Sequence, residues 1–404
     1  MRLLAGWLIA ACALAVFPAA TSSQQSTLTI YSSLPLEGAA RPQTTAIVKG
    51  ARLALEQRGH QAGGYRIRYV SLSDSTRRAR TWTPERTSAN ALRAALDPSA
   101  VAYIGEFNSG ASAISIPLLN EVGLAQISPT NTAIGLTRDG PGAAPGEPFE
   151  YYPTGARHYV RLAPNDRVQA GALAVAMRKR GCRRVATIHD GEVYGAGVGY
   201  WVRYWAKRVG LRVVFSRRMR RMAGSYRRLA AAARRARPQC AVFTGITANG
   251  AVRLFEDLGR ALPRARLFGS DGLAERRFAD SRYGGVSPRL GRRVFLSIST
   301  LAPFAYPSAG QRFFRAYSQR YRDPYPDPYA IYGYEAMQLA LDAVDGAGAD
   351  RAAVIRWLVS VRDRSSVLGR YSIDRYGDTT LRRFGIYRIS KGSIYWAGAV
   401  RAPH

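Results

Sequence analysis

The sequence predicts an α/β protein with two doubly wound parallel-sheet lobes, joined by a hinge that the chain crosses several times. Short apolar segments rich in β-branched residues alternate with amphipathic helical segments, a rhythm typical of parallel sheets covered by helices. The rhythm stops at a loop rich in Gly and Pro between residues 139 and 155 and then restarts. The 404 residues, 47% of them hydrophobic, are also sufficient for two packed cores.

The elements of the first half follow from their residue patterns. Ile47, Ala51 and Leu55 recur at a spacing of four and therefore share one helical face. Thr83 and Pro84 are typical of a helix start, because a Thr hydroxyl accepts a hydrogen bond from the first turn and Pro lacks the N–H that has no partner there. We expect strands at 28–33, 65–72, 101–104 and 124–127, and helices at 44–58, 84–95 and 111–121.

The second half repeats this plan and then departs from it. Gly181 and Gly210 each follow a helical pattern at the position where a helix commonly ends. The expected helices are 166–180, 199–209, 226–237 and 249–258, and the expected strands are 184–189, 211–215, 241–244, 266–269 and 294–298. Helices at 310–321, 329–345 and 350–359 and short strands at 369–373, 384–389 and 394–397 complete the chain. We assign residues 27–162 and 300–366 to an N-terminal lobe, and residues 163–299 and 367–404 to a C-terminal lobe.

The N-terminus is typical of a secretory signal peptide. Arg2 precedes an apolar run that extends to Ala20, and the sequence then becomes polar. We predict that residues 1–24 are removed on export, so that the protein acts in the periplasm or at the cell surface. Alternatively, residues 9–12 form a lipobox and Cys12 becomes a lipidated N-terminus; the apolar run continues past Cys12, which favours ordinary cleavage. No other segment reaches the roughly 18 apolar residues that a membrane span needs.

Positive charge dominates the composition. Lys and Arg number 59 against 27 Asp and Glu, a formal net charge of +32, and nearly all of the cations are Arg. One interpretation is a genome that favours arginine codons; the other is selection for attraction to an anionic surface or polyanion. The arginines are scattered along the chain, which favours the first interpretation. The densest group, at 217–237, has the pattern of a solvated helix face. We expect no nucleic-acid partner.

The sequence contains no recognisable catalytic or cofactor motif. It lacks a Gly-x-Ser-x-Gly elbow, a His-Glu-x-x-His pair and a phosphate-binding Gly-x-x-x-x-Gly-Lys segment. With four His and two Cys beyond the signal peptide, we expect no metal site. His189 and Asp190 end a predicted strand; we interpret them as a cap, with a catalytic role as the alternative. These absences predict a binding protein without a cofactor rather than an enzyme.

Polar residues cluster directly after predicted strands, at the sheet edge where open parallel sheets bind their ligands. In the first half, hydroxyl groups follow two strands and precede helix starts, an arrangement suited to a carboxylate. In the second half, Asp271 follows a strand and could pair with an ammonium group. Together they predict a clamp for a zwitterion; the alternative is that these residues only cap helices. The segments are 105–110, 128–132, 190–195, 244–249 and 269–272.

In their order and spacing, these segments resemble the leucine/isoleucine/valine-binding protein family, the type I periplasmic binding proteins of ABC transporters. The resemblance begins at Ile30, with an opening strand and the Pro35-Leu36-Glu37-Gly38 turn that follows it, and covers almost the whole mature chain. It implies two lobes that close about a hinge on one ligand, and a membrane permease as partner. The matching segments are Ile104-Gly105 with Ser109, Ile127-Ser128-Pro129-Thr130, Ile188-His189-Asp190 with Tyr194-Gly195, and Gly269-Ser270-Asp271-Gly272.

The resemblance also implies roles for individual residues. Ser109 and Thr132 would bind the ligand carboxylate, the Thr130 carbonyl and Asp271 would bind the ammonium group, and Tyr194 would close over the ligand. Two further residues complete the expected site: Thr247, where relatives often carry an aromatic, and Tyr329, which would line the side-chain pocket. Asp271 is one methylene shorter than the glutamate of the best-known branched-chain binders, and Thr247 replaces a tyrosine. These departures leave the identity of the ligand open.

The family fold has a consequence for the two remaining cysteines. Cys182 begins the first strand of the second lobe and Cys240 begins the third, and these strands are neighbours in a flavodoxin-like order. Strand starts on one sheet edge can lie within disulfide range. The resemblance therefore implies a Cys182–Cys240 disulfide in the oxidising compartment, with two separately buried thiols as the alternative.

The function implied is the substrate-binding component of an ABC transporter, a monomer that captures a branched-chain-like amino acid or a related small zwitterion by hinge closure. Alternatives stay open. The same fold could serve as an extracellular sensor, or could bind a non-amino-acid ligand such as an amide or a small organic acid. An exported enzyme and a polyanion binder are further alternatives from other classes, disfavoured by the missing motifs and by the scatter of the arginines.

Overall fold

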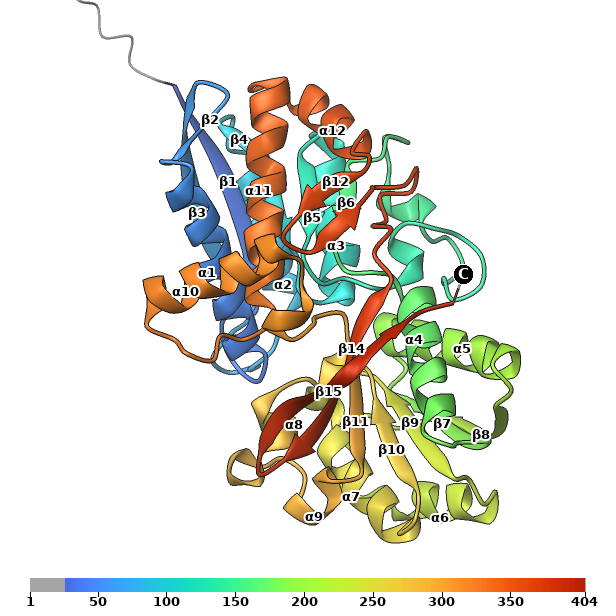
Figure 1. The fold of residues 1–404 in the computed structure, drawn as a ribbon. Helices are drawn as coiled ribbons and strands as arrows, with labels where there is room; N and C mark the ends of the chain where they lie inside the picture. The colour runs from blue at the N-terminus through green and yellow to red at the C-terminus, as the bar shows by residue number, and fades with distance from the viewer. Residues whose placement is uncertain (1–25, 404) are drawn as a thin grey trace, which may run out of the picture.

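The computed structural model describes residues 26–403 and consists of two α/β lobes (Figure 1). The predicted signal peptide, residues 1–24, and the alternative lipid attachment site at Cys12 lie outside the described residues. Within residues 26–403, no helix combines the length and the apolar composition that crossing a membrane requires. The predicted class of two doubly wound lobes is confirmed by the two large sheets.

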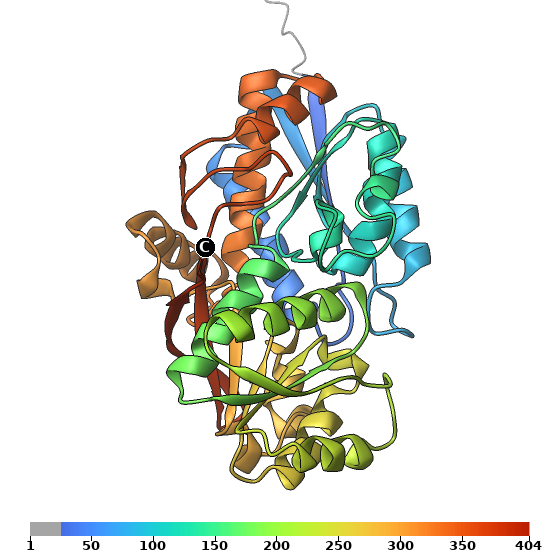
Figure 2. The ribbon, with the colours of Figure 1, turned by 90° about the vertical axis from the view of Figure 1, so that its right-hand side faces the viewer.

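The first lobe is built on a six-stranded sheet with the order β2-β3-β1-β4-β5-β6. Neighbouring residues of β1 point to opposite faces: Ile30 packs with helices α1 and α11, whereas Tyr31 packs with α2 and α3. Both faces are therefore covered (Figures 1 and 2), and the strands carry nearly continuous apolar runs. The strands are β1 (Thr27–Leu34), β2 (Gln61–Ala62), β3 (Tyr65–Ser73), β4 (Ala100–Gly105), β5 (Ala125–Ser128) and β6 (Tyr159–Arg161). The helices are α1 (Arg41–Gln57), α2 (Pro84–Ala95), α3 (Ser109–Glu121), α10 (Ser308–Tyr321), α11 (Ala330–Ala347) and α12 (Arg351–Val359).

The second lobe contains a seven-stranded sheet with the order β15-β14-β11-β10-β9-β7-β8. Helices α4 and α5 cover one face and α6 and α7 cover the other (Figure 1). Its last two strands are antiparallel and extend the sheet at one edge. The strands are β7 (Arg184–His189), β8 (Arg212–Arg218), β9 (Cys240–Thr244), β10 (Arg266–Gly269), β11 (Val294–Ile298), β14 (Arg383–Ser390) and β15 (Ser393–Arg401). The helices are α4 (Asp166–Lys179), α5 (Val193–Arg208), α6 (Arg227–Arg235), α7 (Ala251–Ala261), α8 (Arg276–Ala279) and α9 (Pro288–Gly291).

One predicted helix starts in the wrong place. Helix α5 begins at Val193, six residues before the expected start at residue 199. Its first turns contain Gly195 and Gly197. Because Gly has a low helix propensity, we expected the helix to begin after these residues. Tertiary contacts require these glycines: a Cβ at Gly195 would lie 2.1 Å from an Asp190 carboxylate oxygen, and one at Gly197 would lie 2.5 Å from an Asp166 oxygen. Close packing therefore outweighs local propensity at this helix start.

Cys182 and Cys240 are joined by a disulfide, with 6.0 Å between their Cα atoms. Strands β7 and β9 are parallel neighbours, and the register places Val185 opposite Cys240. Both cysteines are fully buried. The bond links the starts of the two strands, at the end of the sheet opposite to the strand ends that carry the predicted site residues.

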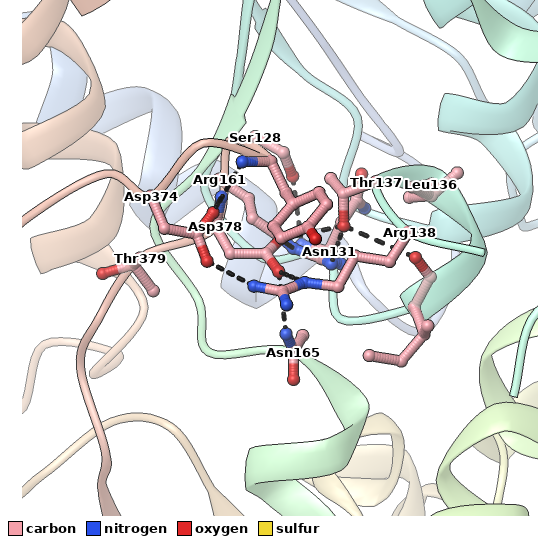
Figure 3. Close-up of polar contacts among 12 residues, drawn as sticks. Ser128, Asn131, Leu136, Thr137, Arg138, Arg161, Asn165, Asp374, Asp378 and Thr379 are labelled. Atoms are coloured by element: carbon pink, nitrogen blue, oxygen red, sulfur yellow. Dashed lines mark hydrogen bonds and ion pairs between the residues drawn. The ribbon is translucent and has the colours of Figure 1, made fainter. Parts of the chain in front are cut away.

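The chain passes between the sheets after β6, after β11 and before β14, and a buried polar network lies beside the first and last of these crossovers (Figure 3). Arg161 ends β6; its Nε donates to Asp378 Oδ1 at 2.7 Å and its Nη2 to Thr137 Oγ1 at 2.7 Å. Asn165, which caps α4 of the second lobe, donates to Asp378 Oδ2 at 2.9 Å, and Arg138 Nε donates to the same oxygen at 2.8 Å. One carboxylate thus connects the first lobe, the second lobe and the returning chain.

The boundary that we assign between residues 366 and 367, ahead of the last crossover, stays a prediction. A short hairpin formed by β12 (Arg364–Ser366) and β13 (Gly369–Tyr371) lies at this point. The Tyr371 hydroxyl donates at 2.8 Å to Glu335, a residue of α11 in the first lobe. The chain therefore contacts the first lobe up to the network around Asp378 before it enters the sheet of the second lobe.

Candidate ligand-binding site

A cleft between the lobes collects the polar strand ends of both sheets. The lobes leave an enclosed volume of about 70 Å³ between them, so the cleft is small and largely closed. Six of the seven predicted site residues line it: Ser109, Thr130, Thr132, Tyr194, Asp271 and Tyr329. The carboxyl ends of the two sheets therefore face one another, as parallel sheets with ligands at their strand ends require.

Hydroxyl groups form the wall that the first lobe contributes. Ser109 is the first residue of α3, and its Oγ accepts the Ala133 N–H at 3.3 Å. Thr130 donates from its hydroxyl to the Phe107 carbonyl at 2.8 Å. Thr132 is only 1% exposed, and its hydroxyl makes no hydrogen bond of normal geometry within residues 26–403. The hydroxyl interacts with the buried Asp166 carboxyl group and acts against the rise of that group's pKa, so a ligand in the cleft would compete with Asp166 for it.

A carboxylate and two tyrosines form the opposite wall. Asp271 follows β10, and its Oδ1 accepts the Tyr194 hydroxyl at 2.5 Å. Tyr194 comes from the first turn of α5, and its oxygen also accepts the Gly272 N–H at 3.3 Å. Burial raises the pKa of Asp271, and hydrogen bonds from Gln169 and Tyr194 offset part of that rise. The wall therefore presents one buried carboxyl group held in place by its neighbours.

Two contacts cross the cleft and hold the lobes together. Tyr329, from the start of α11 in the first lobe, donates to Asp271 Oδ2 at 3.4 Å. Gln43 of α1 donates to the Ala274 carbonyl of the second lobe at 2.7 Å. Each of these hydrogen bonds joins a helix of the first lobe to the loop that follows β10 in the second lobe. The structure therefore has the two lobes closed on one another.

Thr247 is the predicted site residue that the structure does not bring to the cleft. Its hydroxyl donates to the Gly272 carbonyl at 3.2 Å, within the second lobe. Its neighbours Ile246 and Ala248 line the cleft instead. The short η3 turn (Thr247–Asn249) rotates the side chain away from the opening.

The His189–Asp190 pair has a structural role. Asp190 is fully buried and accepts the N–H groups of Glu192 and Ile246 at 3.1 Å each, together with the Asn249 amide at 2.8 Å. Burial lowers the pKa of His189, and two nearby arginines lower it further. The carboxylate therefore fastens the loops behind the cleft, which agrees with the interpretation of this pair as a cap.

Sequence reasoning missed several residues of the cleft wall. Phe107 packs edge-on against Tyr329, with ring centroids 6.1 Å apart. Glu275 lines the cleft four residues after Asp271, beyond the segment that follows the strand directly. Arg80 lies outside the hydroxyl-rich strand ends, whereas Glu37 belongs to the Pro35-Leu36-Glu37-Gly38 turn that carries part of the family resemblance. Of these residues, Glu37 and Phe107, which lies within the segment 105–110, carried a signal in the sequence.

Comparisons with known proteins agree on one family. A family profile described as "Periplasmic binding protein" matches residues 27–393. A curated protein of Pseudomonas aeruginosa, named "Amino acid binding protein", is 24% identical over 349 residues, which are 84% of each chain. A leucine binding protein from Thermotoga maritima has a TM-score of 0.77 at 20% identity, covering 93% of this chain and 99% of the other. A solute binding protein from R. palustris in complex with benzoate has a TM-score of 0.72 at 20% identity, covering 93% and 97%.

Proposed function

This chain belongs to the periplasmic binding protein family, and from that premise we propose that it captures an amino acid or a related small zwitterion for an ABC transporter. The relative in Pseudomonas aeruginosa is named for amino acid binding, and the similar chain from Thermotoga maritima for leucine binding. The closed cleft described above is the site that we assign to this ligand.

The observation that carries the proposal is the opposition of two chemistries across the cleft. The wall of the first lobe offers the buried Thr132 hydroxyl and the N-terminus of α3 at Ser109, which suit a carboxylate. The wall of the second lobe offers the Asp271 carboxyl group, 9% exposed, which suits an ammonium group. A zwitterion spanning the cleft would satisfy both walls at once.

The same opposition explains capture by hinge closure. A ligand held by one lobe gains its second set of contacts only when the other lobe closes, so binding favours the closed arrangement. The links from Tyr329 and Gln43 across the cleft add to that arrangement. Rotation would take place at the crossovers beside the Asp378 network. We propose no chemical step on the ligand.

A second candidate ligand is an aromatic carboxylate. The benzoate-bound relative has the same fold, and Phe107 and Tyr329 place two rings in this cleft. A ligand without an ammonium group would leave the Asp271 carboxyl group without a counter-charge, and burial already raises the pKa of this group. The carboxylate wall of the first lobe would serve both classes of ligand.

Isothermal titration with matched ligands separates the two candidates. Leucine and 4-methylpentanoate, and phenylalanine and 3-phenylpropanoate, differ only by the α-amino group. The zwitterion clamp predicts binding of the amino acid and a loss of about 10-fold or more in its affinity on Asp271→Asn. Stronger binding of the acids without an amine, unaffected by Asp271→Asn, would replace the first candidate by the second.

Export and the transport partner complete the proposal. The apolar N-terminal segment supports cleavage near residues 20–24, and the family supports a location outside the cytoplasm and a permease in the membrane. Mass spectrometry of the mature protein tests the cleavage site, and a lipid adduct on Cys12 would favour the alternative anchor. Gel filtration with light scattering tests the expected monomer, and ligand uptake in a deletion strain distinguishes transport from sensing.

A further inference from the structure

The cleft contains a second buried carboxyl group, that of Glu275, to which the proposed binding of a zwitterion by Asp271 and the first lobe assigns no role. It lies between the η4 turn (Asp271–Leu273) and helix α8, and it lines the cleft while only 8% exposed. Its Oε2 has no hydrogen-bond partner within residues 26–403. A buried carboxylate oxygen without a partner is expensive, so a donor is expected to reach it.

Two other buried carboxyl groups of this chain show how such a group can be satisfied, whereas Asp74, Glu106 and Asp166, like Glu275, keep a buried oxygen without a hydrogen-bond partner within residues 26–403. Glu335 accepts hydrogen bonds from Arg364 at 2.7 Å and from the Tyr371 hydroxyl at 2.8 Å. Asp271 itself accepts the hydroxyls of Tyr194 and Tyr329. Of the described carboxyl groups with such an oxygen, only Glu275 lines the cleft. It is therefore the one that a donor in the cleft can reach.

The charge of the cleft wall points to the nature of that donor. Its ionisable residues are four acids and one base, namely Glu37, Glu192, Asp271, Glu275 and Arg80; of the acids, Glu192 forms an ion pair with Arg221 at 2.8 Å. The chain as a whole carries 59 Lys and Arg against 27 Asp and Glu. A cleft with an acidic wall inside a strongly basic protein concentrates cations, because field lines are focused in a concave site of low dielectric.

From these observations we propose that the ligand is an amino acid whose side chain carries a second positive group, an amine or a guanidinium, and that Glu275 binds this group. The inference rests on the proposed function, since the zwitterion clamp holds the other end of the same ligand. Glu275 is then a specificity-determining residue: Asp271 with its two tyrosines binds the backbone ammonium, and Glu275 selects the side chain.

The ionisation of Glu275 agrees with this role. Burial raises its pKa to about 8, with Arg277 acting against that rise and Asp327 adding to it. A ligand cation at Oε2 would favour the ionised form and provide the missing hydrogen bond. A charge-assisted bond of this kind contributes about 10- to 100-fold in affinity.

Isothermal titration of the full mature chain with two matched ligand pairs tests the inference. Lysine and norleucine share one carbon skeleton and differ by the side-chain amine, and arginine and citrulline differ by the charge of the guanidinium. We expect the cationic member of at least one pair to bind about 10-fold or more tightly than its neutral partner. Glu275→Gln should abolish that preference and leave the affinity for the neutral partner within about twofold.

Two controls keep the result interpretable. Glu121→Gln makes the same change at an exposed position at the end of α3, outside the cleft wall, and should retain the preference. The melting temperature of Glu275→Gln should stay close to that of the parent, because the two side chains have the same size and the pKa of about 8 leaves ligand-free Glu275 largely uncharged at neutral pH. A folded variant makes loss of preference a binding effect.

The outcomes distinguish this inference from the proposed function. If norleucine or leucine binds as tightly as lysine and Glu275→Gln does not change the ratio, the inference is wrong and the amino-acid clamp stands. If cadaverine, which lacks a carboxylate, binds as tightly as lysine, the carboxylate wall is unused and both are wrong. If only aromatic acids bind, both are wrong as well.

Discussion

Arg161 and Asp378 lie 217 positions apart in the sequence and form a buried ion pair of 2.7 Å at the junction of the two lobes (Figure 3). The exposed fraction of the Arg161 side chain is 0% and that of Asp378 is 2%. Burial alone would raise the pKa of Asp378, but the guanidinium groups of Arg161 and Arg138 outweigh it and lower the pKa to about 2. This ion pair therefore stabilises the junction of the lobes at a place outside the wall of the cleft.

We expect Asp378→Asn to lower the free energy of unfolding by about 3 kcal/mol at pH 7, because it leaves the buried Arg161 guanidinium without a counter-charge. Since the pKa of Asp378 is lowered from 3.8 to about 2, the ionised form contributes stability above pH 3.8 that is lost as the pH falls through 2. That shift corresponds to roughly 2 kcal/mol. Urea unfolding of parent and variant at several pH values measures the difference, which should shrink below pH 3.8.

Asp374→Asn is the matched control for that comparison. Asp374 also pairs with Arg138, but its side chain is 30% exposed. Asp374→Asn should therefore lower the free energy of unfolding by much less than Asp378→Asn does. Two results would show that the buried Arg161–Asp378 pair does not stabilise the junction. One is an equal loss of unfolding free energy in the two variants, and the other is a difference in unfolding free energy between Asp378→Asn and the parent that does not vary with pH.

Thr132→Val should weaken ligand binding about tenfold and change the melting temperature of the ligand-free protein less than Thr130→Val does. The Thr132 hydroxyl is buried in the cleft wall, makes no hydrogen bond of normal geometry within residues 26–403, and interacts in the ligand-free protein with the Asp166 carboxyl group. Thr130→Val serves for comparison, because the Thr130 hydroxyl already donates to the Phe107 carbonyl and its loss should reduce stability. Unchanged affinity of Thr132→Val would exclude the hydroxyl from the ligand contacts.

Gln43→Met should shift the ligand-free protein toward an open arrangement. The Gln43 amide donates to the Ala274 carbonyl across the cleft at 2.7 Å, and a bond of this kind contributes about 1 kcal/mol, a factor of about five in an equilibrium constant. The apparent affinity should fall by up to that factor, because ligand binding must then supply the closure. Small-angle scattering with and without ligand measures the change, and saturating ligand should restore the compact form. An unaltered scattering profile in the ligand-free variant would show that this bond does not hold the lobes.

Replacing both Cys182 and Cys240 by Ser should lower the free energy of unfolding by about 4 kcal/mol in the loop-entropy estimate, because the disulfide spans 58 positions. Ligand affinity should stay within about twofold, since the bond joins strand starts at the far end of the sheet from the cleft. Urea unfolding of the parent with and without reductant provides the comparison: the reduced parent should match the variant, and a parent indifferent to reductant would argue against the linkage.

Most strands of the two sheets could be predicted from the sequence to within one residue. The strand expected at 241–244 is β9, and those expected at 184–189 and 266–269 coincide with β7 and β10. Such central strands are buried on both faces and appear as uninterrupted apolar runs. Strand β8 continues three residues beyond its expected end, to Arg218, because an edge strand can carry exposed arginines that look like a loop. Strands β2 and β12 contain only two and three residues, too few for a pattern.

The sequence alone determined the alternation of elements, the two lobes and the polar strand ends, because each of these depends on residues that are neighbours along the chain. Tertiary structure decided which charges meet. The direction of the Thr247 side chain depends on a local turn, and the pairing of Arg161 with Asp378 depends on where the chain crosses between the lobes. Whether Glu275 has a hydrogen-bond partner depends on which residues pack around it after folding. The local sequence around Glu275 therefore cannot predict it.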